Sequence, residues 1–497
     1  MSRLPRIPYA WARAQGLFFE PVEGGGWTLL VRQGSTLAAL AEVRRFAEVL
    51  PPLTRVSAAE FEPRIARAYA DSSESAESAQ DLADTLGQDE DFAALVSEAK
   101  ATVDLMEEQD AAPIIRMINA MLVQALRAGA SDIHFEPYEG RSVIRFRSDG
   151  MLHDVVTPPR AVHAALASRI KVMAELDIAE KRLPQDGRIS LRVAGRQVDV
   201  RVSTLPTGHG ERVVLRLLDK ESTRLDFASL GMPATTIARV DQAIRQPHGL
   251  FLVTGPTGSG KTTTLYAALQ RIDRSRLNVL TVEDPIEYEL AGVGQTQVNP
   301  KIDLNFARAL RAILRQDPDV VMIGEIRDAE TAQIAIQASL TGHLVLATLH
   351  TNDAASAVTR LVDMGIEPFL VSSSLLGVLS QRLVRRLCPA CRQPSALGSS
   401  LLSDLGESVA QRVAGLIPQE AAGCSACHFT GYRGRMGIYE HMAIDAALRQ
   451  LIHDRAPESE LSKAARQGGT LSLREDGARC LASGDTSVQE LLRVTRD

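Results

Sequence analysis

The chain has 497 residues, of which 45% are hydrophobic and 23% charged, as in a soluble globular protein of about three domains. A net charge of −6 and only 4% aromatic residues disfavour a globally basic nucleic-acid binder that stacks bases. No uncharged apolar run reaches the roughly 18 residues of a membrane span, and the N-terminus lacks the apolar core of a signal peptide. We therefore expect a cytosolic protein that reaches membranes only through partners.

The first 110 residues divide into two parts by composition. Residues 1–70 mix short apolar runs with a Pro-Pro pair and predict a small α/β or helical domain. In residues 71–110, Ser, Ala and carboxylates dominate, as in DSSESAESAQ, which is typical of a mobile acidic linker. The alternative is an exposed acidic helix within a single domain.

Residues 111–222 predict an α+β domain with a half-exposed antiparallel sheet. An apolar stripe predicts a helix that begins at Pro113 and ends near Gly129. Alternating apolar and polar residues then predict a strand that leads into an Asp-Gly turn at residues 149–150. The same alternation over residues 189–202, interrupted by Ala-Gly, predicts a hairpin.

The pattern changes near residue 249, where continuous apolar strands begin to alternate with helices. GLFLVTG is followed by KTTTLYAALQRI, then LNVLTVEDP by NFARALRAILRQ, and DVVMIGEI by DAETAQIAIQASL. Strands that are apolar on both faces are typical of a parallel α/β sheet, so residues 223–385 predict such a core. Residues 386–436 hold two cysteine pairs, and residues 437–497 predict a helical region.

One segment between a predicted strand and a predicted helix matches the phosphate-binding pattern G-x-x-x-x-G-K-[ST] in full. Glycines let backbone N–H groups curl around phosphate oxygens, and the helix N-terminus adds a positive dipole end. Lys261 is expected to meet the β- and γ-phosphates, and Thr262 to bind Mg²⁺. The predicted nucleotide-binding residues are Gly255, Pro256, Thr257, Gly258, Ser259, Gly260, Lys261, Thr262 and Thr263.

Carboxylates follow two further predicted strands, at the sheet edge where parallel sheets bind ligands. Glu325 ends the apolar strand VVMIGE and is expected to hold Mg²⁺ directly or through water. Glu287 in VEDPIE is the candidate that orients the attacking water and accepts its proton. Glu283 competes for that role, and spacing alone does not separate the two.

Histidines and arginines complete the candidate site. His343 and His350 bracket one predicted strand, although a lone His is more often structural. Phosphoryl transfer needs cations on the γ-phosphate, and Arg311 and Arg315 share one helix face with Arg308. Each arginine taken alone is more often a solvated or ion-paired surface residue.

Taken together, GPTGSGKTT, VEDPIEYE, DPDVVMIGEIRD, TGHLVLATLHTNDA and ASDIHFEP resemble the secretion ATPase superfamily over residues 111–497. These proteins are the motors of type II secretion, type IV pili and conjugation machines. The cysteine pairs and the opening PYAWARAQGLFFEP favour the type II secretion branch, the general secretion pathway E family. The alternative within the superfamily is a type IV pilus assembly ATPase.

The resemblance implies a RecA-like ATPase core preceded by a PAS-like α+β domain, and a catalytic set matched motif by motif. In that set Glu287 is the catalytic carboxylate, Glu325 takes the Walker B role, and His343 and His350 form the histidine box. Four arginines surround the γ-phosphate, some of them from a moving domain or a neighbouring subunit. They are Arg201, Arg216, Arg311 and Arg315, whereas Arg308 is not matched.

The resemblance also implies an assembly and a place in the cell. It implies a homo-hexamer on the cytoplasmic face of the inner membrane that powers pseudopilus assembly and uses ATP and Mg²⁺. Residues 1–70 are then a domain that docks on the cytoplasmic part of the L component, and the F component of the platform is a second candidate partner. No nucleic-acid partner is expected.

Cys388, Cys391, Cys424 and Cys427 form two C-x-x-C pairs separated by residues 392–423. Each pair offers two thiolates to one metal, so the two pairs predict a tetrahedral Zn²⁺ site. Reduced cysteines without metal, or disulfides, are the alternatives. Cys480 stands apart and is expected to be a buried or incidental thiol.

Two functions outside the superfamily's transport role stay open from the sequence. A nucleic-acid translocase on the same core would need nucleic-acid-stimulated hydrolysis, against which the acidic balance argues. A regulatory module that holds nucleotide without turnover is disfavoured by the full set of acidic and basic residues.

Overall fold

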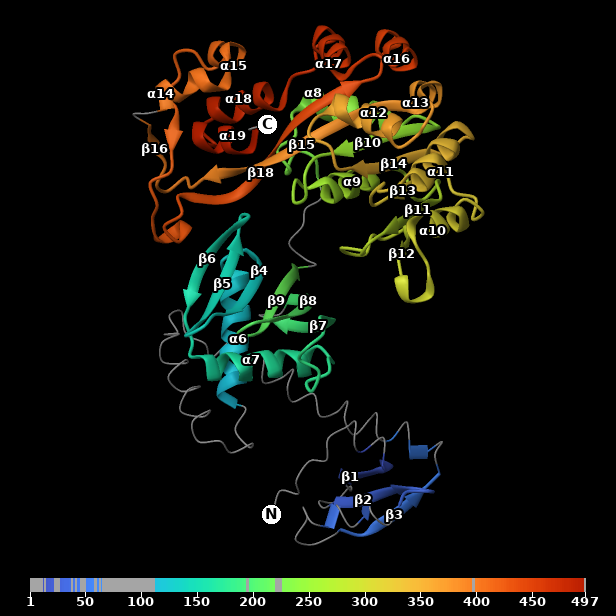
Figure 1. Ribbon diagram of the computed structural model, residues 1–497, viewed down its shortest axis with the longest axis vertical. Coiled ribbons are helices and arrows are strands. Elements are labelled where there is room, and N and C mark those ends of the chain that lie inside the picture. Colours follow the sequence, from blue (N-terminus) through green and yellow to red (C-terminus); the bar gives the residue numbers. More distant parts are fainter. Residues whose placement is uncertain are drawn as a thin grey trace. The chain divides into compact units, whose positions relative to one another are not determined.

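The computed structural model describes residues 12, 15–21, 27–36, 39–40, 43–44, 51–57, 60–61, 64, 112–193, 196–219, 226–395 and 398–495. The expected linker at residues 71–110 lies outside these ranges. The chain forms two compact units, one built mainly on residues up to 217 and the other mainly from residue 218 onwards (Figure 1).

The N-terminal region contains a three-stranded sheet in the order β1-β2-β3. Its strands are β1 (Leu17–Pro21), β2 (Trp27–Arg32) and β3 (Leu53–Val56), with β1 antiparallel and β3 parallel to β2. Phe18, Leu30 and Phe61 are fully buried, and the rings of Phe18 and Phe61 meet edge to face at 5.3 Å. The apolar runs of this region therefore build a small core of their own.

The α+β region has one six-stranded sheet, in the order β6-β5-β4-β9-β8-β7. The elements in chain order are α6 (Ala112–Arg127), β4 (Ala130–Pro137), β5 (Ser142–Ser148), β6 (Met151–Val156), α7 (Arg160–Met173), β7 (Gln185–Val193), β8 (Arg196–Thr207) and β9 (Gly210–Asp219). The predicted helix and the hairpin are confirmed, because β7 pairs antiparallel with β8 and Leu191 faces Val198. The predicted turn is also present, with Asp149 and Gly150 both at positive φ.

A seven-stranded sheet forms the second unit, in the order β12-β11-β13-β14-β10-β15-β18. The predicted parallel α/β core is confirmed, since all the pairings among the first six strands are parallel. Its strands are β10 (Gly249–Thr254), β11 (Val279–Glu283), β12 (Gly294–Gln297), β13 (Val320–Ile323), β14 (Leu344–Leu349), β15 (Leu375–Leu387) and β18 (Tyr432–Ala443). Strands β10, β13 and β14 are buried at every residue, as continuous apolar runs require.

Helices cover this sheet (Figure 1). They are α8 (Ala234–Ile244), α9 (Lys261–Gln270), α10 (Phe306–Ile313), α11 (Ala329–Leu340), α12 (Ala354–Asp363) and α13 (Pro368–Ser374), with a short 3-10 turn η1 (Pro300–Ile302). Two buried clusters result, one around Leu310, Ala335 and Val345 and the other around Tyr266, Phe251 and Leu346. Strand β10, which leads into the phosphate loop, is therefore packed by one of these clusters on each face of the sheet.

The C-terminal part returns to the sheet before it becomes helical. Strand β18 runs antiparallel to β15 and crosses the expected domain boundary at residue 436, because its pairing with β15 extends from Tyr432 to Ala443. Around it lie β16 (Gln393–Pro394), α14 (Gly398–Leu401), η2 (Leu402–Leu405), α15 (Glu407–Arg412), β17 (Gln419–Glu420), η3 (Ser425–Cys427), α16 (Ala446–His453), α17 (Glu458–Gln467), α18 (Leu473–Ala482) and α19 (Val488–Thr495). Among the helices that the structure describes, none combines the length and the apolar character needed to cross a bilayer.

Candidate nucleotide site

The phosphate loop joins the end of β10 to the start of α9. Gly255, Gly258 and Gly260 all have positive φ, and Gly260 precedes the first residue of the helix. A Cβ at Gly255 would lie 2.4 Å from the Gln381 carbonyl oxygen, so only glycine fits there. The loop therefore presents its backbone to one point above the helix N-terminus, as a phosphate cradle requires.

The ammonium of Lys261 is turned into this cradle. Its Nζ donates to the carbonyl oxygens of Gly255 at 2.8 Å and Pro256 at 3.1 Å. Burial lowers the pKa of Lys261 to about 8, although the nearby charge of Glu325 opposes that shift. The cradle thus holds a poorly solvated cation at the place where a polyphosphate would supply negative charge.

A side chain from a distant strand holds the loop. Gln381 on β15 is 1% exposed; its Nε2 donates to the Ser259 carbonyl at 2.6 Å, and its Oε1 accepts from Thr264 Oγ1 at 2.7 Å. One buried amide therefore fixes both the loop and the helix that follows it. Gln381 is not among the residues predicted from the sequence, although a polar Ser-Gln pair inside an apolar strand is a usable signal.

Glu325 lies just beyond β13, at the carboxyl edge of the sheet. Its carboxylate forms an ion pair with Arg327 and lies 3.2 Å from His350 Nε2. Gly324, the residue before Glu325, lies close to β11, because a Cβ there would sit 3.3 Å from the Glu283 backbone. Lys261, Glu325 and His350 are therefore brought together by β10, β13 and β14.

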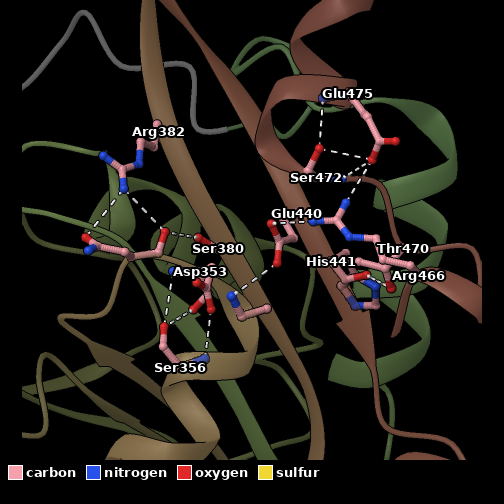
Figure 2. Close-up of polar contacts among 12 residues, drawn as sticks. Asp353, Ser356, Ser380, Arg382, Glu440, His441, Arg466, Thr470, Ser472 and Glu475 are labelled. Carbon is pink, nitrogen blue, oxygen red and sulfur yellow. Dashed lines mark hydrogen bonds and ion pairs between the residues drawn. The ribbon is translucent and has the colours of Figure 1, made fainter. Parts of the chain in front are cut away.

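The loop after His350 is anchored on the C-terminal strand pair (Figure 2). Ser380 Oγ donates to the Asn352 carbonyl at 3.3 Å, and the Ala354 amide donates to Glu440 Oε1 at 3.3 Å. Asp353 caps α12 by accepting from the Ser356 amide at 2.8 Å. The position of His350 is thus set by β15 and β18 as well as by its own strand.

The two carboxylates of VEDPIE have different surroundings. Glu283 is 2% exposed and accepts from Thr281 Oγ1 at 2.5 Å, from Gln295 Nε2 at 3.0 Å and from the Tyr266 hydroxyl. Glu287 is half-buried, and its amide donates to Tyr266 Oη at 3.3 Å. Buried donors therefore occupy the carboxylate of Glu283. Tyr266, which was not predicted from the sequence either, links this carboxylate to the segment that carries Glu287.

The structure does not gather every predicted site residue. His343 precedes β14 and contacts the Ala338 carbonyl through Nδ1 at 2.9 Å, so the whole strand separates it from His350. At about 3.3 Å per residue that separation is roughly 20 Å. Arg311 pairs with Glu330 at 2.5 Å, and Arg315 donates to the Arg311 carbonyl at 2.9 Å. Arg201 on β8 and Arg216 on β9 belong to the other unit.

The four cysteines converge, as their spacing predicts. The Sγ distances are 3.9 Å for Cys388–Cys424, 3.8 Å for Cys391–Cys427 and 3.8 Å for Cys424–Cys427. Tetrahedral Zn–S bonds of about 2.3 Å place sulfurs about 3.8 Å apart, so the donor set fits zinc. Amides of Gly423 and Gly431 also point at the sulfurs of Cys391 and Cys427, at 3.3 and 3.2 Å. The thiols are free rather than disulfide-bonded.

A parallel sheet with a phosphate loop at one strand end and a carboxylate at the end of a nearby strand defines a P-loop ATPase. Comparison with known proteins narrows this class. A family model described as "Type II/IV secretion system protein" matches residues 107–493, and a model of an N-terminal domain of "GSPII protein E" matches residues 6–69. The chain belongs to the type II/IV secretion system family and is a secretion ATPase of its type II branch.

Individual relatives agree with this placement. The chain is 57% identical to the type II secretion system protein HxcR of Pseudomonas aeruginosa, with 99% of both chains covered. It is 56% identical to the type II secretion system ATPase E of Vibrio cholerae, over 93% of this chain and 91% of that one. Among solved structures, the pilus retraction motor PilT with bound ADP matches 76% of this chain and 96% of its own, with a TM-score of 0.51 and 26% identity. The Legionella pneumophila ATPase DotB, at a TM-score of 0.57, 21% identity and coverage of 78% and 97%, shares the fold.

Proposed function

We propose that this secretion ATPase splits ATP at the loop of residues 255–262 and works as a homo-hexamer that drives pseudopilus assembly. The observation that carries the proposal is the Lys261 ammonium, buried in a glycine cradle and facing Glu325. Among the described residues the partners of this buried cation are two carbonyl oxygens, so it gains much when a polyphosphate enters. The relatives named for type II secretion support the assignment of the work that hydrolysis performs.

In this proposal the chain's own groups divide the chemistry. The loop amides and Lys261 bind the β- and γ-phosphates, while Thr262 and Glu325 hold Mg²⁺, which when bound neutralises developing phosphate charge. Glu287 orients the attacking water and accepts its proton. Glu283 is left to position the loop, because buried donors already occupy its carboxylate.

His350 orients Glu325 across their 3.2 Å contact. Arg311 and Arg315, together with Arg201 and Arg216 of the other unit, are proposed to supply charge near the γ-phosphate in the working assembly. His343 precedes β14, whereas His350 follows it, so His343 lies at the end of the strand away from the phosphate loop of its own chain.

The cysteine segment and the N-terminal residues are proposed to have structural and docking roles. The four cysteines are proposed to hold one Zn²⁺ that ties β15 to the start of β18. Residues 1–70 are proposed to dock on the cytoplasmic part of the L component, with the F component as a second partner. This places the motor on the cytoplasmic face of the inner membrane, and the match of residues 6–69 to a protein E N-terminal domain supports it.

The test is ATP turnover by the purified full-length chain. Lys261→Ala is expected to reduce turnover by at least about 100-fold while the thermal unfolding profile stays that of a folded protein. Lys463→Ala, at an exposed lysine of α17, is the matched control and is expected to keep wild-type turnover. Turnover by Lys261→Ala within about threefold of wild type would remove the proposed site.

A further inference from the structure

A pocket of about 550 Å³ lies at the edge of the seven-stranded sheet, between α8, β18 and α18, all in the second unit. No residue of the phosphate loop lines it. The geometry points to this pocket as a second ligand site, which takes a small organic phosphate and joins α8 to the C-terminal helices.

The floor of the pocket is an unsatisfied histidine. His441 on β18 is 6% exposed, and neither ring nitrogen has a hydrogen-bond partner among the described residues. Its ring stacks on Phe251 at 6.2 Å, and nearby Thr470 donates to its backbone carbonyl rather than to the ring (Figure 2). A buried polar group without a partner costs about 1–3 kcal/mol, so a ligand that pairs with it recovers that cost.

The charge state of this histidine suits a ligand that accepts a hydrogen bond from it. Burial and the charge of Arg239 lower the pKa of His441 to about 4. The ring is therefore neutral at pH 7 and offers one N–H donor and one acceptor nitrogen. A phosphate monoester, which is mainly a dianion at pH 7, accepts from the ring N–H through one of its phosphate oxygens.

The walls of the pocket carry an excess of positive charge. Asp476 is matched by Arg479 at 3.0 Å, and Glu475 by Arg466 at 2.8 Å. Arg239 and Arg412 also line the pocket, and within the described ranges neither side chain has a hydrogen bond or ion pair. Two guanidinium groups are thus left uncompensated around a neutral floor, which favours an anion.

A helix N-terminus adds donors on the same side. Helix α8 follows Pro233, which makes no side-chain cap, and Thr235 and Thr236 of its first turn line the pocket. First-turn amides have no partner within a helix, and the dipole there favours negative charge. The amides, the two arginines and His441 therefore surround one space.

The pocket volume indicates that the anion has an organic part. About 550 Å³ lies within the usual range for small-molecule sites and far exceeds the volume of a bare phosphate. Leu471, Ala478 and Ala482 supply apolar wall. A soluble phosphate monoester fills both parts of the site, whereas inorganic phosphate fills only one.

The test measures binding of phenyl phosphate to the full-length chain by calorimetry, with saturating ADP and Mg²⁺ present so that the phosphate loop is filled. We expect binding that Arg239→Gln and Arg412→Gln each weaken by about 10-fold, since each removes one charged hydrogen bond. Arg449→Gln, at an exposed arginine of α16, is the matched control and is expected to change nothing. The ring ¹⁵N signals of His441, assigned by their loss in His441→Phe, are expected to shift on titration.

Several results would overturn the proposal. These are an unshifted His441 signal, undiminished binding by a variant that carries both Arg239→Gln and Arg412→Gln, or inorganic phosphate or benzyl alcohol binding as tightly as phenyl phosphate. A separate arm uses vesicles that contain phosphatidylglycerol. Arginine-dependent binding to vesicles without binding of phenyl phosphate would assign the anion to a lipid and overturn a soluble ligand. Because the P-loop is filled throughout, these outcomes are independent of whether ATP is hydrolysed there.

Discussion

Gln381 on β15 donates its side-chain amide to the Ser259 carbonyl at 2.6 Å, although 122 residues separate the two in sequence. The same side chain accepts from Thr264 on α9 at 2.7 Å. The last parallel strand of the sheet is thereby connected to the phosphate loop. Strand β15 also pairs along its length with β18. The C-terminal region is therefore connected to the phosphate loop through β15 and the side chain of Gln381.

Gln381→Leu keeps the side-chain size but removes both hydrogen bonds. The Ser259 carbonyl then loses its partner, so we expect the free energy of unfolding to fall by about 1–3 kcal/mol. We also expect KM for ATP to rise by about 10-fold, because the loop is less well ordered before binding. Steady-state kinetics and chemical denaturation measure both. Gln333→Leu, at an exposed site on α11, is the control, and an equal effect of both variants would refute the anchoring role.

Nucleotide binding should take up a proton at alkaline pH. Lys261 titrates near pH 8 in the folded protein because burial lowers its pKa from an ordinary value of 10.5. Bound phosphates favour the charged lysine, so its pKa rises on binding. We expect the Kd for ADP and Mg²⁺ to weaken by about 10-fold from about pH 7 to about pH 9. Calorimetry in buffers of different ionisation enthalpy detects the proton, and a buffer-independent heat at the alkaline pH would contradict this.

The same lowered pKa affects the stability of the nucleotide-free protein. Below about pH 8 the lysine is protonated in both the folded and the unfolded state, so the cost of burying its charge is fully present. Between about pH 8 and 10.5 the folded state releases its proton first, which adds stability as the pH rises. Lys261→Met lacks this titration. We expect the difference in unfolding free energy between Lys261→Met and wild type to shrink over that window, and a constant difference would contradict the burial of a charge.

Glu283→Gln should damage the fold more than the chemistry. The new amide group would face the donors of Thr281 and Gln295, which leaves buried groups unpaired. We expect a loss of about 1–3 kcal/mol in unfolding free energy. Turnover per folded molecule is expected to stay within about fivefold of wild type, since this carboxylate is remote from solvent. A stable variant with abolished turnover would instead assign the base to Glu283.

Zinc removal should affect the segment between β15 and β18. We expect about one zinc per wild-type chain by atomic absorption, because the four thiols complete a tetrahedral site. Cys391→Ser should lose the metal and lower the melting temperature, whereas Cys480→Ser should retain it, because Cys480 lies in a separate apolar cluster. Full zinc retention by Cys391→Ser, or a metal-free wild type, would refute the site.

The site was predictable from the sequence where its chemistry is local. In residues 255–262 and in the cysteine pairs, the spacing of residues within the segment predicts the site. The continuous apolar runs indicate a parallel sheet. Gln381 and Tyr266 were not predicted from the sequence, because their roles depend on strand order and on which face of an element contacts the loop. His343 and His350 look equivalent in the motif, yet a parallel strand places its two ends on opposite edges of a sheet.

The domain boundary predicted at residue 436 is likewise a feature that local sequence patterns could not place. The cysteine pairs suggest a separate subdomain, but β18 continues through Met436 and Gly437 without a break in its pairing to β15. Pairing between strands that are distant in sequence has no local signature, so the sheet edge could only be seen in three dimensions.

The proposed catalytic base is tested by comparing Glu287→Gln with Glu289→Gln, two carboxylates in the same loop. Glu289 is exposed and serves as the control. Single-turnover hydrolysis of γ-labelled ATP is measured alongside ATP affinity. We predict that Glu287→Gln binds ATP within about threefold of wild type but hydrolyses it at least about 100-fold more slowly, while Glu289→Gln matches wild type. Hydrolysis by Glu287→Gln at close to the wild-type rate would contradict this role of Glu287.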